Sequence, residues 1–303
     1  MPMSTSDSSI EMILYGVLYL IFSTPLVPLQ GTVAMAICLK CPKNSTFKLM
    51  NLINCLEIGH VLCHFLSSFF LFFPDIAEKN KVVVRIIGST LNTLWITELP
   101  LMALLAVSRI FIFQGVRYRK FAALARIMLF LIIAWMLFVI IVGSYTQNFM
   151  FSPPSWQYDL KAPYAQVFVN LEIFFVLFSL VIAYLSYLAI AYLIHTKKKG
   201  SISAGNRSSE ISILVQYTFT VTYIVVYIVL WHHGSDLLDI NSHLGLALVN
   251  CFWIGGAYIS PVTLLILNKT VRKEFQRIIG IEKKNRVSTV LVTGNSNKGT
   301  FTC

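Results

Sequence analysis

Long apolar stretches separated by short polar segments set the hydropathy pattern of this chain. Seven of these stretches are long enough to cross a membrane as helices, since a helix rises about 1.5 Å per residue and the hydrocarbon layer is about 30 Å thick. The predicted spans are Met12–Leu39, Phe47–Phe73, Val82–Phe113, Ile127–Tyr145, Tyr164–His195, Ile211–Trp231 and His243–Leu267. The pattern predicts an all-α membrane protein, a seven-transmembrane helix bundle formed by one domain over residues 1–281.

The hydropathy pattern changes after the seventh span. Over Asn268–Ile281 apolar residues recur at helical spacing, with basic residues on the other faces. The apolar face contains Val271, Phe275, Ile278 and Ile279. Such a segment is typical of a short amphipathic helix that lies on a membrane surface. Residues 282–303 are rich in Ser, Thr, Asn and Gly, which predicts a disordered tail.

Basic residues are distributed unevenly between the two sides of the predicted spans. The chain has 24 lysines and arginines, and all but four belong to one side. The exceptions are Lys79, Lys81, Arg85 and Lys161. Because the cytoplasmic segments of membrane proteins carry an excess of Lys and Arg, we expect the N-terminus outside. The amphipathic helix and the tail are then cytoplasmic.

The overall composition supports the membrane class. Hydrophobic residues make up 56% of the chain and charged residues only 12%, with a mean hydropathy of +0.73, which no soluble domain requires. The net charge of +11 invites a nucleic-acid interpretation, but a basic cytoplasmic side facing anionic lipid accounts for it. We therefore expect the lipid bilayer as a partner and no nucleic acid.

Ionisable residues are rare inside the predicted spans, and because their burial in a membrane is costly they are candidates for function. Glu98 and Arg109 lie in the third span eleven residues apart, or three helical turns, so both project from one face. For Glu98, contact with a ligand and a structural hydrogen bond between helices are both open. Depth and chemistry select the side chains expected to line a ligand pocket, which are Trp95, Glu98, Glu172, Tyr227, Asn250 and Trp253.

Two histidines of the second span suggest a different chemistry. His60 and His64 are four residues apart, a spacing that places them on one helical face and suits a metal pair. A zinc-dependent intramembrane hydrolase is therefore one alternative, although the chain has no HExxH motif. Phosphate-binding glycine loops and a GxSxG motif are also absent, so we expect no enzyme, no metal and no cofactor. A small-solute transporter is a further alternative, which the lack of an internal repeat disfavours.

The longest predicted outer connection, residues 146–163, is rich in proline and aromatic residues. Pro153 and Pro154 make it stiff, and Trp156 and Tyr158 follow them. The aromatic residues either cap a pocket among the helices or anchor the chain at the membrane interface, where such residues are common. None of the outer connections contains a cysteine, so we expect no extracellular disulfide.

Several of these features together resemble a rhodopsin-like G-protein-coupled receptor. They are the seven spans, Arg109 at the inner end of the third span, Pro261 low in the seventh, and the amphipathic helix. More narrowly, three segments resemble the nematode serpentine chemoreceptors, closest to class T. The segments are Phe47–Leu52 with Glu57-Ile58, Trp95–Glu98 through Leu104–Arg109, and Ser260–Leu264 through Leu267–Arg272.

The resemblance implies a function for the chain. Receptors of this kind sense a small molecule, such as an odorant, at the outer face and activate a heterotrimeric G protein at the inner face. By this resemblance Arg109, Ser260 and Pro261 form the coupling switch. The implied location is the plasma membrane, in the sensory cilium of a chemosensory neuron.

The chain departs from the rhodopsin-like pattern at several positions. Ser108 replaces the acidic residue that usually precedes the arginine, so it offers no carboxylate to Arg109. Residues 211–231 contain no proline, and Ser260 and Leu264 replace the asparagine and tyrosine of the seventh-span motif. The disulfide between the third span and the second outer loop has no cysteines to form it. These departures predict an inactive-state lock that is either different or weak, and they leave the topology unchanged.

Overall fold

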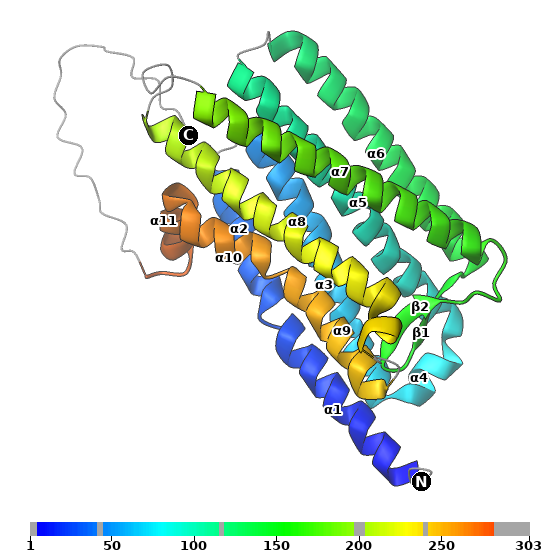
Figure 1. Cartoon of the computed structure of the whole chain (residues 1–303). Coiled ribbons are helices and arrows are strands. Elements are labelled where there is room, and N and C mark those ends of the chain that lie inside the picture. The colour runs from blue at the N-terminus through cyan, green and yellow to red at the C-terminus, as the bar shows by residue number, and fades with distance from the viewer. Residues whose placement is uncertain (1–4, 41–44, 115–117, 197–203, 239–241, 282–303) are drawn as a thin grey trace.

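The computed structural model describes residues 5–40, 45–114, 118–196, 204–238 and 242–281 (Figure 1). The elements in this part of the chain are, in order, α1 (Thr5–Ser23), α2 (Leu26–Lys40), α3 (Ser45–Phe72), α4 (Pro74–Lys79), α5 (Lys81–Gln114), α6 (Tyr118–Thr146), β1 (Phe149–Ser152), β2 (Ser155–Tyr158), α7 (Ala165–Thr196), α8 (Ala204–Leu238), α9 (His243–Gly256), α10 (Ile259–Leu267) and α11 (Lys269–Ile278). The tail predicted to be disordered, residues 282–303, lies outside the described residues.

Seven apolar spans form the bundle, as the hydropathy pattern predicts. Helices α3, α5, α6, α7 and α8 each contribute one span, α1 and α2 together form the first, and α9 and α10 together form the seventh. Figure 1 shows α4 and the two strands at one end of the bundle and α11 at the other. We call these the hairpin end and the α11 end. The short β1–β2 hairpin is an element that the sequence pattern did not predict.

The first and seventh spans are each divided into two helices. α1 ends at Ser23, and Pro25 lies in the break before α2 begins at Leu26. In the seventh span, α9 ends at Gly256 and α10 begins at Ile259. Proline has no N–H to donate to the carbonyl four residues earlier, and its ring crowds that carbonyl. Prolines at 25 and 261 therefore account for the two breaks.

Hydrogen bonds join the two breaks to each other. Pro261 leaves the carbonyl of Ala257 without a helical donor, and Nε2 of Gln30 in α2 donates to this oxygen at 2.9 Å. In return, the hydroxyl of Tyr258 donates to the carbonyl of Phe22 at 2.7 Å, beside the break in the first span. Backbone carbonyls within a membrane need such partners, so each divided span completes the hydrogen bonding of the other.

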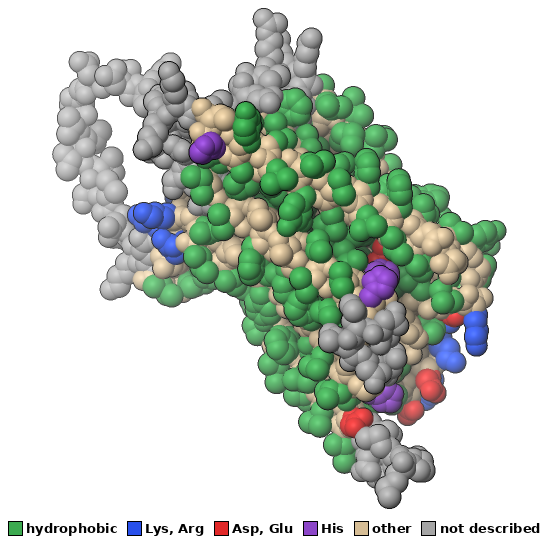
Figure 2. Space-filling view, in the orientation of Figure 1, with side chains coloured by type: hydrophobic (Ala, Val, Ile, Leu, Met, Phe, Trp, Pro, Cys, Tyr) green, Lys and Arg blue, Asp and Glu red, His purple; other side chains and the backbone are tan. Residues whose placement is uncertain are grey.

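The third span, α5, is the most enclosed of the seven. It contacts α3, α6 and α7, and it continues as one helix through Pro100. The outer faces of the bundle carry exposed apolar side chains, among them Phe130 and Ile141. Figure 2 shows apolar side chains over the middle of the bundle and charged ones towards its ends. This surface suits lipid around the middle and water at both ends, as in a multi-pass membrane protein.

The amphipathic helix predicted after the seventh span is present as α11. Asn268 begins it, because its side-chain oxygen accepts hydrogen bonds from two backbone N–H groups of the first turn at 3.0 and 3.1 Å. Val271 is fully buried, and Phe275 and Ile278 pack against the core of the bundle. Ile279, predicted on the same apolar face, is 46% exposed, because the helix ends one residue before it.

An ion pair joins α11 to the first span. The carboxylate of Glu274, 1% exposed, lies 3.3 Å from Nζ of Lys40 at the end of α2 and also pairs with Arg277. Together with the packing of Val271, this ion pair fixes α11 against the end of the first span, and its position on the membrane surface stays a prediction.

Candidate ligand-binding site

The connection between α6 and α7 folds into an antiparallel hairpin over one end of the bundle. We call β1 and β2 together the lid, in which Phe149 pairs with Tyr158. Trp156 is completely buried, and its ring meets that of Phe70 in α3 at a centroid distance of 6.4 Å. Phe149 is buried as well. Of the two roles that the sequence leaves open for this connection, the structure favours the cap.

The lid approaches α5 most closely at Gly88. A Cβ atom at this position would lie 2.8 Å from Cζ3 of Trp156 and 3.1 Å from the carbonyl oxygen of Phe149. A residue without a side chain is therefore required for strand and helix to come this close. At the tip of the lid, the hydroxyl of Tyr19 in α1 donates to the carbonyl of Pro154 at 2.7 Å.

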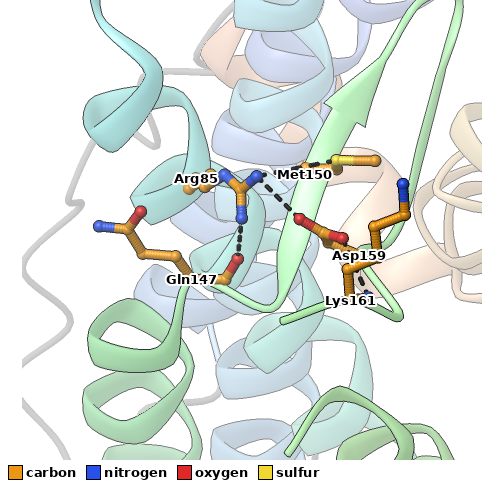
Figure 3. A network of polar contacts seen from close by, with 5 residues as sticks. All are labelled: Arg85, Gln147, Met150, Asp159 and Lys161. Carbon is orange, nitrogen blue, oxygen red and sulfur yellow. Dashed lines mark hydrogen bonds and ion pairs between the residues drawn. The ribbon is translucent and has the colours of Figure 1, made fainter. Parts of the chain in front are cut away.

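An arginine in the first turns of α5 holds the base of the lid (Figure 3). Nη2 of Arg85 lies 2.9 Å from Oδ2 of Asp159, the residue directly after β2. Nη1 of Arg85 donates to the carbonyl of Gln147, just before β1, at 2.6 Å. These segments have no cysteines for a disulfide, and the ion pair joins them instead.

An aromatic cluster lies below the lid, with Trp253 of α9 at its centre. The rings around Trp253 are those of His60, His64, Trp95, Tyr227 and Trp231, at centroid distances of 4.8 to 5.7 Å. Aromatic pairs at such distances attract one another beyond their burial of apolar area. The cluster thus packs α3, α5, α8 and α9 together at one level of the bundle.

The two histidines of this cluster bond to each other. Nε2 of His60 and Nε2 of His64 lie 3.1 Å apart, so one ring donates and the other accepts. Across the part of the chain that the structure describes, no three His, Cys, Asp or Glu side chains gather as metal ligands would. The metal pair suggested by the histidine spacing therefore has no third protein ligand among these residues.

A buried carboxylate lies between the aromatic cluster and the lid. Glu172 of α7 accepts from Nε1 of Trp95 at 3.2 Å and from the hydroxyl of Tyr158 at 2.6 Å. The same hydroxyl accepts from Nδ2 of Asn92 at 2.6 Å. Burial and the neighbouring Glu172 raise the pKa of Tyr158 well above its usual value. The phenol therefore keeps its proton at neutral pH and donates it to the hydrogen bond.

Two small cavities lie among these side chains. The first has a volume of about 30 Å³, and its polar lining includes Glu57, Glu98 and Thr220. The second has a volume of about 10 Å³ and lies beside Asn92 and Glu172. Since one water molecule needs about 10–15 Å³, neither cavity admits an organic ligand with the helices in this arrangement.

The first cavity brings two carboxyl groups together from different helices. Glu57 of α3 and Glu98 of α5 are close enough for their charges to interact. Nε2 of Gln30 donates to Glu57 at 3.2 Å as well as to the carbonyl of Ala257. Glu98 borders this cavity, a position from which it can contact a ligand or a water molecule.

Most of the side chains that the sequence predicts in the pocket border these cavities. They are Trp95, Glu98, Glu172, Tyr227 and Trp253. Asn250 borders neither, although it is fully buried. Asn92 was missed, and Tyr158 was predicted only as one of the aromatic residues that could cap the pocket, not as a residue that bonds inside it. Asn92 precedes Trp95 by three residues and so shares its helical face, but Tyr158 reaches the site only through the fold of the lid.

A larger cavity lies apart from this centre, among α5, α6 and α7. Its volume is about 350 Å³, and its lining is almost entirely apolar. Met128, Leu131 and Phe178 border it and are exposed, so it opens on the outer surface of the bundle, which faces lipid. None of the residues singled out from the sequence lines it.

Arg109 lies in the half of α5 nearer the α11 end and is buried in the bundle. It is within electrostatic reach of the hydroxyl groups of Tyr187 in α7 and Tyr217 in α8. Tyr217 is also within reach of Glu57 and Glu98. This buried tyrosine is therefore within electrostatic range of both the arginine and the two carboxyl groups of the first cavity.

The other two predicted switch residues, Ser260 and Pro261, are buried in α10. Nε2 of Gln216 in α8 donates to the carbonyl of Ser260 at 3.3 Å. The hydroxyl of Ser108 donates to the carbonyl of Leu105 in its own helix at 2.6 Å. Helix α8 is thus bonded to the seventh span through Gln216 and lies within electrostatic range of Arg109 through Tyr217.

The described residues form a seven-helix membrane bundle whose aromatic and carboxylate centre lies between a lid and a buried arginine, an arrangement consistent with a seven-transmembrane receptor. Among protein families, the one described as serpentine type 7TM GPCR chemoreceptor Srt matches residues 3–288. The chain belongs to this family, and the resemblance to serpentine chemoreceptors is confirmed. No match to the chain was found among curated proteins.

Proposed function

We propose that this chemoreceptor binds a small molecule entering from the hairpin end and activates a heterotrimeric G protein at the α11 end. The observation that carries the proposal is the burial of Glu98, Glu172 and the aromatic cluster between the lid and Arg109. Ionisable groups at membrane depth are costly and usually serve a function. A mostly apolar site with a few convergent polar groups is also typical of small-molecule recognition.

The charge distribution supports an orientation with the hairpin end outside. The basic residues assigned to the hairpin end are Lys79, Lys81, Arg85 and Lys161, and all the other lysines and arginines belong to the opposite side. Such an excess marks the cytoplasmic side, where a G protein is found. The N-terminus then lies outside, and the ciliary plasma membrane of a sensory neuron is where such a receptor would meet external chemicals.

Binding must change the packing of the helices. The two cavities at the proposed site measure about 30 and 10 Å³, whereas small-molecule sites usually have about 300–1,000 Å³. A ligand would therefore stabilise a wider arrangement that already exists as a minor population. In that arrangement α8 and α9 stand further from α3 and α5, which separates the rings of Tyr227 and Trp253 from Trp95.

The same movement would reach the coupling residues through α8. Tyr217 belongs to this helix and interacts with Arg109, and Gln216 bonds it to the carbonyl of Ser260 beside Pro261. When α8 moves outward, these contacts open and Arg109 becomes accessible from the cytoplasm. A Gα subunit can then dock an acidic or carboxyl-terminal surface against the exposed guanidinium.

Nucleotide exchange on a purified heterotrimeric G protein tests this proposal. The full chain in lipid nanodiscs is exposed to a panel of volatile and water-soluble compounds, and at least one should accelerate exchange. Arg109→Ala should abolish the acceleration at equal receptor concentration. Arg126→Ala, an exposed arginine of α6, is the matched control and should preserve it. Full ligand-driven exchange by Arg109→Ala would remove the role given to this residue.

Two other classes of membrane protein predict different results. A small-solute transporter would accumulate a compound inside sealed vesicles without nucleotide exchange. A zinc-dependent hydrolase would purify with bound zinc and lose turnover on His64→Ala. Either result in the absence of exchange would replace the receptor proposal.

A further inference from the structure

The hydroxyl of Tyr158 lies between two polar side chains of the proposed ligand site. It accepts from Nδ2 of Asn92 and donates to Oε2 of Glu172, both at 2.6 Å. Nε1 of Trp95 donates to the other carboxylate oxygen at 3.2 Å. We call Asn92, Trp95 and Glu172 together the hydroxyl subsite. Its members come from α5 and α7, whereas the group that fills it comes from the lid.

The hydrogen bonds of the subsite select one kind of chemical group. A single group must accept from Asn92 and donate to Glu172 at the same time. A carbonyl can only accept, an ammonium can only donate, and a hydroxyl does both. Asn92 and Glu172 are buried, so an occupant that can only accept or only donate would leave one of them unsatisfied, which is costly inside a protein.

The side chain of Tyr158 leaves no room beside it for a ligand that carries a hydroxyl group. The cavity next to Asn92 and Glu172 has only about 10 Å³, and the Tyr158 ring packs edge-on against Phe149 at a centroid distance of 4.9 Å. A ligand that reaches Glu172 must therefore displace the phenol of Tyr158. The next residue, Asp159, carries the ion pair with Arg85, so this displacement acts on the base of the lid.

We propose that Asn92, Trp95 and Glu172 form a hydroxyl-binding subsite, that Tyr158 fills it in the ligand-free receptor, and that the activating ligand is a small alcohol or phenol. The link from displacement to signalling rests on the proposed receptor function. The binding chemistry of the subsite does not, because it follows from the hydrogen bonds alone.

Tyr158→Ala tests the subsite, because it removes the phenol side chain that fills the subsite and allows added phenol to take its place. Truncating this half-buried ring leaves a space beside Asn92 and Glu172 that small aromatic molecules of the same shape can enter. Phenol should bind the purified Tyr158→Ala chain in nanodiscs saturably and raise its unfolding temperature. Toluene, which lacks the hydroxyl, should bind at least about tenfold more weakly than phenol. Wild type, in which Tyr158 competes, should bind phenol more weakly than the variant does.

Two further variants make the experiment specific. Tyr145→Ala removes a tyrosine that is 88% exposed at the end of α6 and should create no phenol site. Adding Glu172→Leu to Tyr158→Ala should abolish the preference for phenol over toluene while retaining the cavity. Equal binding of phenol and toluene by Tyr158→Ala would overturn the subsite, and so would a preference that survives Glu172→Leu.

A milder substitution covers the case in which Tyr158→Ala does not fold. Tyr158→Phe keeps the ring and removes only the competing hydroxyl, so phenol should bind at least threefold more tightly than to wild type. Unchanged phenol affinity would contradict the proposal. If phenol binds as expected but no compound drives nucleotide exchange, the subsite stands and the receptor function fails.

Discussion

Arg85 and Asp159 lie 2.9 Å apart and join the start of the third span to the residue directly after the lid. Asp159 follows Tyr158, whose hydroxyl fills the hydroxyl subsite. The position of the lid and the occupancy of the subsite therefore depend on one another through a single peptide bond. An ion pair at this place can open when the ligand displaces Tyr158 and close again afterwards, which a disulfide cannot do.

Arg85→Ala should loosen the lid and leave the bundle folded. A partly exposed ion pair contributes about 1 kcal/mol or less, so amide exchange over Phe149–Tyr158 should accelerate by about fivefold. Hydrogen exchange with mass spectrometry measures this, with Lys81→Ala, an exposed lysine one turn earlier, as the control. Unchanged exchange in Arg85→Ala would mean that apolar contacts alone hold the lid.

Gly88→Ala should destabilise the receptor, because the new methyl group would lie 2.8 Å from the ring of Trp156. Overpacking of this kind typically costs about 1–3 kcal/mol. The midpoint of thermal unfolding, followed by tryptophan fluorescence, should fall. Gly31→Ala is the matched control, because a Cβ there meets nothing within 4 Å and alanine favours the helix. Equal midpoints for the two variants would show that the lid is not seated on α5 as described.

Gln30→Leu should destabilise the receptor strongly, although the two side chains have nearly the same volume. It removes the hydrogen bonds to Glu57 and to the carbonyl of Ala257, and each buried group left without a partner costs about 1–3 kcal/mol. Unfolding of the purified receptor in mixed detergent micelles measures the loss. Gln166→Leu, at an exposed position of α7, should be close to neutral. A neutral Gln30→Leu would argue against the bond between the divided spans.

Tyr158 should resist ionisation in alkaline solution. Burial and Glu172 raise its pKa in the folded protein above the ordinary value of 10.0. The contribution of such a raised pKa to the free energy of unfolding is fully present below the unfolded-state pKa. This contribution is lost as the pH rises through the folded-state pKa. At about pH 11, tyrosinate absorbance of the folded wild type should therefore equal that of Tyr158→Phe. A larger signal in wild type would show that the phenol of Tyr158 is accessible to solvent.

The seven spans and most of the aromatic centre follow directly from the sequence. Apolar length identifies a span whatever its neighbours are, and a polar or aromatic residue at membrane depth, such as Trp95 or Glu172, is conspicuous against lipid-like surroundings. The divided first and seventh spans were within reach as well, because Pro25 and Pro261 interrupt helical hydrogen bonding wherever they occur.

The lid and its contacts could not be predicted in this way. Strands β1 and β2 have four residues each, too few for an alternating pattern to be recognised, and Tyr158 reaches Glu172 only once they pair. Gln30 carries no charge, so a search for ionisable residues passed over it. The burial of Glu274 likewise depends on Lys40, which is more than 200 residues away in the chain.

The bonds between the two divided spans bear on how the chain enters the membrane. Gln30 and the carbonyl of Phe22 belong to the span that the ribosome delivers before the other six, and their partners Ala257 and Tyr258 belong to the one that follows those six. Until then the early helix carries polar groups that lipid cannot satisfy. We therefore expect the first span to leave the insertion machinery late, and receptors truncated before the seventh span to be recognised and degraded.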